Sequence, residues 1–99
     1  MDFAFYRNFI TVAETGNLSA AAKRLGIVQP ALSAQMKTIE RNYGVQLFKM
    51  QRGKRHIELT EAGETFLQQA RQLCNTEDDI SLRMQAFGRR AAGTLRFSV

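Results

Sequence analysis

A short alanine-rich segment, a glycine and the only proline of the chain follow one another between residues 19 and 33. The alanine-rich segment ends at Leu25 and is strongly helix-forming. Gly26 follows where the chain leaves this helix, because a residue without Cβ adopts the left-handed conformation freely. Pro30 suits the first turn of the next helix, where its missing N–H would have no partner anyway. The run therefore predicts two helices joined by a tight turn.

A further helix is predicted before this pair. Residues 2–15 carry apolar side chains at three- and four-residue steps, which is typical of an amphipathic helix, and Gly16-Asn17 ends it. Ser19 is placed to cap the second helix. The third helix is expected from about residue 30 to Tyr43. Its apolar stripe consists of Leu32, Met36, Ile39 and Tyr43.

Two short strands are predicted after the third helix, at residues 47–50 and 56–59. In the second strand Ile57 and Leu59 point to one side, and the polar residues between them to the other. The connection, residues 51–55, is basic and contains a glycine for the turn. The pattern predicts a hairpin with a cationic tip.

The last predicted helix is long and begins after Thr60, which is placed to cap it. Its apolar residues fall into a heptad row, which is typical of a coiled coil, with Glu77 as an acidic interruption. The row is longer than a small domain can cover, so we favour the interpretation that it packs against the helix of a second chain. Packing against the chain's own domain stays the alternative. The predicted organisation is residues 1–59 as a compact domain, 60–88 as a dimerisation helix, and 89–99 as a hinge followed by a strand.

Positive charge is concentrated in the middle of the chain. The net charge is +5, but residues 19–56 hold eight lysines and arginines against Glu40 alone, and the flanking segments on either side are acidic up to residue 88. A face that meets phosphates shows such a pattern, whereas a merely solvated face, the alternative, would intersperse the two signs.

Gln29, Ser33, Lys37 and Arg41 follow one another at four-residue steps on the side of the third helix opposite its apolar stripe. A helix of this size fits the major groove of B-DNA, and glutamine can pair bidentately with adenine. Lys37 and Arg41 are better placed for phosphates, and the basic turn for the backbone or a minor groove. The plainer interpretation of Gln29 and Ser33 is a polar surface with a helix cap.

The succession of residues resembles the amino-terminal DNA-binding domain of LysR-type transcriptional regulators. The resemblance rests on the run NLSAAAKRLGIVQPALS at residues 17–33, on Leu47-Phe48, and on LTEAG at residues 59–63. It implies a winged helix-turn-helix, a dimerising linker helix, and a carboxy-terminal effector-binding domain whose first strand resembles residues 94–99. The chain departs from the family pattern at Ala34 and Met50, where the family often has arginine, and both changes remove an expected DNA contact.

The complete prediction is a mainly α winged helix-turn-helix with a long linker helix. We expect the protein to bind double-stranded DNA at an inverted repeat, as a homodimer in the bacterial cytoplasm. A tetramer of the full-length protein is left open. The residues expected to bind DNA are Ser19, Gln29, Pro30, Ser33, Lys37, Arg41, Arg52, Gly53, Lys54 and Arg55. The residues expected in the dimer are Phe66, Ala70, Leu73, Ile80, Met84 and Phe87.

Other classes of function are disfavoured by what the chain contains. One cysteine and one histidine give neither a disulfide framework nor the ligands of a usual metal site, and no nucleophile–base pair is recognisable, so we expect no enzyme, metal or cofactor. No apolar stretch approaches the length of a membrane span. A small-molecule effector is expected only through the missing carboxy-terminal domain. A protein-interaction module, in which the heptad row is the functional surface, remains the competing hypothesis.

Overall fold

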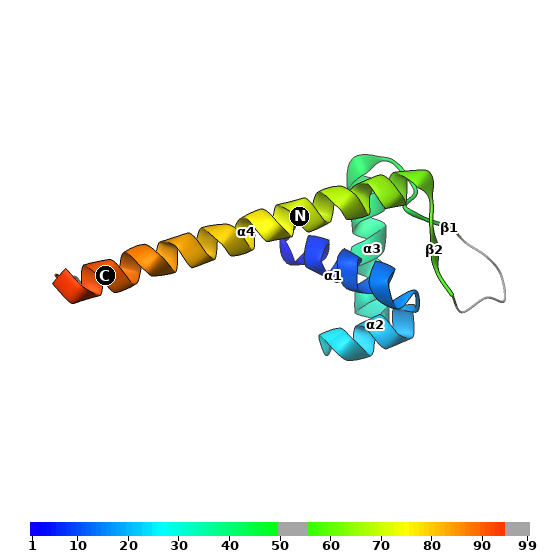
Figure 1. Cartoon of the computed structure of the whole chain (residues 1–99). Helices are drawn as coiled ribbons and strands as arrows, with labels where there is room; N and C mark the ends of the chain where they lie inside the picture. Colours follow the sequence, from blue (N-terminus) through cyan, green and yellow to red (C-terminus); the bar gives the residue numbers. More distant parts are fainter. Residues whose placement is uncertain (50–55, 95–99) are drawn as a thin grey trace.

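The computed structural model describes residues 1–49 and 56–94. In chain order the elements are α1 (Ala4–Thr15), α2 (Leu18–Leu25), α3 (Gln29–Tyr43), β1 (Phe48–Lys49), β2 (Glu58–Leu59) and α4 (Glu61–Thr94). Helices α1, α2 and α3 form a small head, and α4 crosses it and projects as a rod, with the strands at the opposite end from the rod's free tip (Figure 1). The mainly α winged helix-turn-helix with a long helix is thus confirmed.

The turn between α2 and α3 is built as the sequence predicts. Gly26 ends α2 with φ of 72°, in the left-handed region, and its N–H donates to the Lys23 carbonyl at 3.2 Å. The Ile27 N–H donates back to the Ala22 carbonyl at 3.0 Å. These bonds satisfy carbonyl groups at the helix end and fix the direction in which α3 leaves.

The cap of α2 is Asn17, not Ser19. The Asn17 side-chain oxygen accepts a hydrogen bond from the Ala20 N–H at 2.9 Å, while Ser19 is exposed within the first turn. The expectation for Ser19 was wrong because the helix begins at Leu18, so its cap lies one residue earlier. A residue with extended backbone and a short acceptor side chain is what the cap position requires.

This assignment gives a stability prediction with a matched control. Asn17→Ala removes the cap and should lower the free energy of unfolding by about 1 kcal/mol. Ser19→Ala should change it by less than about 0.5 kcal/mol, because the substitution leaves the cap in place. Urea unfolding followed by circular dichroism measures both. Equal losses for the two variants would contradict the assignment.

The core lies where the three short helices meet. Phe9, Leu32, Ile39, Leu47 and Val12 are the largest fully buried side chains. Leu25 and Ile27 are partly buried against them, as expected for residues that set the angle between α2 and α3. The predicted stripe of α3 is buried except at its last member: Tyr43 is exposed, and its hydroxyl group contacts that of Tyr6.

The two strands are antiparallel and shorter than predicted, with Phe48 opposite Leu59 and Lys49 opposite Glu58. Ile57 and Leu59 both pack against the core, as predicted. The Glu40 carboxylate of α3 accepts hydrogen bonds from the N–H groups of Leu47 and Phe48, at 2.8 and 3.3 Å. The base of the wing is thereby held against the end of α3.

Helix α4 has 34 residues, a length of about 51 Å. Thr60 caps it as predicted, accepting from the Gly63 N–H at 2.9 Å. The helix continues to Thr94, so the hinge expected from residue 89 is helical up to that point. Of the strand expected at residues 94–99, Thr94 is helical and the remainder lies outside the described residues. Within residues 1–49 and 56–94, no helix combines the length and hydrophobicity needed to cross a membrane.

Candidate nucleic-acid interface

The predicted reading face of α3 points away from the core. Gln29, Lys37 and Arg41 are exposed and Ser33 is half-buried. The four residues occupy one side of the helix over about 18 Å. In the described part of the chain, Gln29, Ser33 and Lys37 form no side-chain hydrogen bond or ion pair. Their polar groups are therefore free to contact another molecule.

The remaining predicted DNA contacts fall into two groups. Ser19 and Pro30 are exposed at the first turns of α2 and α3. The expected wing contacts, Arg52, Gly53, Lys54 and Arg55, and the departure at Met50, lie outside the described residues. The wing's described base carries Lys49, whose ammonium group lies 3.8 Å from the Glu58 carboxylate, with both side chains about half exposed.

Helix α3 is braced from behind by polar contacts that the sequence patterns did not reveal. The Asn8 amide of α1 donates to the Gln35 side-chain oxygen at 2.6 Å, on the flank of α3 away from Gln29. Glu40 is the second brace, through its bonds to β1. Its position as the only acid in a basic block was a signal for such a role, whereas Asn8 and Gln35 gave none. These contacts limit the freedom of α3 to rotate or tilt.

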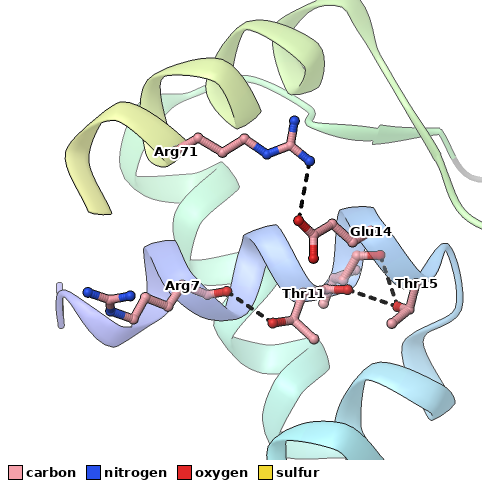
Figure 2. A network of polar contacts seen from close by, with 6 residues as sticks. Arg7, Thr11, Glu14, Thr15 and Arg71 are labelled. Atoms are coloured by element: carbon pink, nitrogen blue, oxygen red, sulfur yellow. Dashed lines mark hydrogen bonds and ion pairs between the residues drawn. The ribbon is translucent and has the colours of Figure 1, made fainter. Parts of the chain in front are cut away.

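Ion pairs join the head to α4. The Arg7 guanidinium donates to Glu77 at 2.6 Å and to Asp78 at 2.8 Å. Farther along α1, Glu14 accepts from Arg71 at 3.4 Å (Figure 2). The acidic interruption at Glu77 is thus a partner for α1, and Asp79 pairs with Arg83 on its own helix at 2.8 Å. The two contacts with α1 help to set the angle between the head and the rod.

The heptad row of α4 divides into two parts. Phe66 contacts the Phe9 ring edge-on at 4.7 Å, and Ala70 is only 2% exposed. The start of α4 lies across α1 (Figure 1), where Ala70 is buried in its own chain and leaves little surface for a partner, while Phe66 is partly buried against the core and its place in the dimer stays a prediction. Leu73, Ile80, Met84 and Phe87 are exposed.

Among residues 1–49 and 56–94, four side chains have shifted pKa values. Hydrogen bonds to Asp78 and Glu77 raise the pKa of Arg7, and the bond to Asp79 raises that of Arg83. The hydrogen bond with Tyr43 raises the pKa of Tyr6, and burial raises that of the Cys74 thiol. Each shift leads away from neutral pH, which argues against acid–base chemistry at these positions. Among the described residues no group of three or more His, Cys, Asp or Glu side chains is placed to hold a metal ion.

Comparison with known proteins connects this geometry with a family. Residues 4–64 match the model of the bacterial regulatory helix-turn-helix proteins of the lysR family. Over 96 residues the chain is 45% identical to the HTH-type transcriptional regulator ClcR of Pseudomonas putida, covering 97% of this chain and 32% of ClcR. The chain spans about a third of the length of such relatives.

Solved structures agree in fold as well as in sequence. A CbnR_DBD–DNA complex superposes with a TM-score of 0.82 and 41% identity, over 89% of this chain and 99% of that one. A BenM_DBD complex with catB site 1 DNA gives a TM-score of 0.82 and 32% identity, over 89% and 97%. The match to the family model extends over more than half of the residues and includes α1, α2, α3 and the wing strands. The chain therefore belongs to the lysR family of bacterial regulatory helix-turn-helix proteins.

Proposed function

We propose that this chain binds double-stranded DNA sequence-specifically, as the DNA-binding part of a dimeric transcriptional regulator. The observation that carries the proposal is the polar side of α3 that faces away from the core, with Gln29 and Ser33 at its start and the exposed Lys37 and Arg41 farther along. The DNA present in the matched CbnR and BenM structures supports the same assignment.

The geometry assigns different tasks to the two ends of this face. A glutamine amide can donate an N–H to the adenine N7 and accept from the adenine N6–H at the same time, in the major groove. Lysine and arginine instead meet phosphates, which carry no sequence information. We therefore assign Gln29 and Ser33 to base reading and Lys37 and Arg41 to the backbone, together with the basic wing residues of the sequence.

A dimer suits this task because one helix reads only a few base pairs. Two copies of α3 held at a fixed distance would read an inverted repeat. In this proposal the exposed row Leu73, Ile80, Met84 and Phe87 pairs two chains. A small-molecule effector would act through a further domain of a longer regulator in the bacterial cytoplasm.

Sequence preference tests the proposal directly. Gln29→Ala should weaken binding to a selected duplex about 5- to 150-fold, the equivalent of one bidentate base contact, and should relax preference at one base pair in each half-site. Lys37→Ala is the matched control on the same helix face. It should weaken selected and scrambled duplexes alike, and lower the slope of log affinity against log salt by about one.

Selection from a random duplex pool, followed by anisotropy titrations at two salt concentrations, measures both variants. Equal losses on selected and scrambled duplex for Gln29→Ala would remove the base-reading role. Weak binding without salt dependence for the unmodified chain would favour a protein-interaction module instead.

A further inference from the structure

Val28 is the most exposed large apolar side chain of the described residues, at 67%. It lies at the N-cap of α3, directly before Gln29, with extended backbone at φ −76° and ψ 146°. Its side chain cannot accept a hydrogen bond, and the cap has none. Valine is among the poorer residues for this position, where serine, threonine, asparagine and aspartate are preferred. Val28 therefore leaves α3 without a side-chain cap and exposes apolar surface to water, and both effects lower the stability of the head.

The first two turns of α3 after Val28 carry no charged side chain. Pro30, Ala31 and Ala34 are also exposed at this end of α3, and Gln29 is the exposed polar side chain among them. The first charged residue of the helix is Lys37, more than two turns away. Such a tip lacks the arginine or lysine that usually reads the two acceptors of guanine. It matches the major-groove edge of an A·T pair, where the adenine acceptor and donor lie beside the thymine methyl group.

We propose that Val28 is a specificity-determining residue whose exposed isopropyl group contacts the C5-methyl group of a thymine at or beside the adenine read by Gln29. The inference rests on the proposed function and refines it, since it names one chemical group of the target. Adjacent residues at the start of α3 would thereby read the two strands of one short A·T-containing step.

Removal of single methyl groups from the duplex tests this contact. Each thymine of a selected duplex is replaced in turn by deoxyuridine, which lacks the C5-methyl group and keeps the base-pairing edge. The unmodified chain should bind about fourfold more weakly when one particular thymine in each half-site is replaced, as expected for one lost methyl contact. With Val28→Ser the ratio of thymine to uridine affinity at that position should fall to about one.

Two controls separate this effect from folding and from general hydrophobicity. Val28→Ser introduces a side chain that can cap α3, so its melting temperature should rise rather than fall. Val45→Ser alters another exposed valine, just after the opposite end of α3, and should leave the uridine ratio at fourfold.

The outcomes distinguish the inference from the function on which it rests. Specific binding with no uridine-sensitive thymine overturns the role of Val28 and leaves the proposed function intact. A sensitive thymine that Val28→Ser still discriminates also overturns it, and assigns the methyl contact to Pro30, Ala31 or Ala34. If the chain selects no duplex at all, the proposed function fails and the inference with it.

Discussion

Replacing Gly63 by alanine should destabilise the head by about 3 kcal/mol, even though alanine is the better helix former. A Cβ at this position would overlap the backbone carbonyl oxygen of Leu47 and press on Leu59 at 3.1 Å. The obstacle is backbone rather than the end of a flexible side chain, so relief requires α4 to move away from Leu47, the residue before β1. That movement would separate Phe66 and Leu67 from the core.

Gly88→Ala is the matched control for this prediction. Gly88 lies in the same helix, and nothing lies within 4 Å of a Cβ built there. Alanine should therefore stabilise α4 by up to about 1 kcal/mol through helix propensity. Urea unfolding should show opposite signs for the two substitutions. Stabilisation by both would mean that α4 does not approach the Leu47 backbone closely.

Introducing a charge at Ile80 should abolish dimerisation and weaken binding to a duplex with two half-sites by about a hundredfold or more. An aspartate in the paired row would lie without a partner in an apolar contact. Loss of the second chain removes the gain in affinity that comes from joining two binding events, which is about 100- to 10,000-fold. Ile80 is 54% exposed in the single chain, so Ile80→Asp should leave the fold of the head unchanged.

Leu82→Asp tests whether position or mere hydrophobicity matters. Leu82 is more exposed than Ile80, at 63%, and lies on the same helix outside the heptad row. This variant should remain dimeric and bind within about threefold of the unmodified chain. Sedimentation and anisotropy measure both properties. A dimeric Ile80→Asp variant would show that the row is not in the dimer interface. A monomeric variant with unchanged affinity would show that DNA binding does not depend on the dimer.

Short-range features of this chain were predictable because their causes lie within a few residues. The glycine ending α2, the proline in the first turn of α3 and the cap at Thr60 depend on local backbone geometry alone. The same reasoning placed the cap of α2 two residues too late, at Ser19 instead of Asn17. The polar face of α3 followed from its period of 3.6 residues, since burying Leu32, Met36 and Ile39 turns the opposite side outward.

The division of the α4 row could not be predicted in this way. A heptad pattern shows that a stripe of α4 needs apolar cover, but the same stripe can be covered by the chain's own head or by a second chain. Phe66 packs against Phe9, which lies far away in the sequence, whereas Ile80 stays 54% exposed. Only the placement of α4 across α1 separates the two cases.

Periodicity and turn chemistry in the sequence were enough for the helix order, the base-reading candidates and the family resemblance. The tertiary structure alone decided where the rod leaves the head, which half of its apolar row stays open, and how Arg7 reaches Glu77 and Asp78 across 70 and 71 positions of the sequence. The physical reason is range. Backbone conformation and helix faces depend on neighbouring residues, whereas burial and ion pairing depend on which distant surfaces the folded chain brings together.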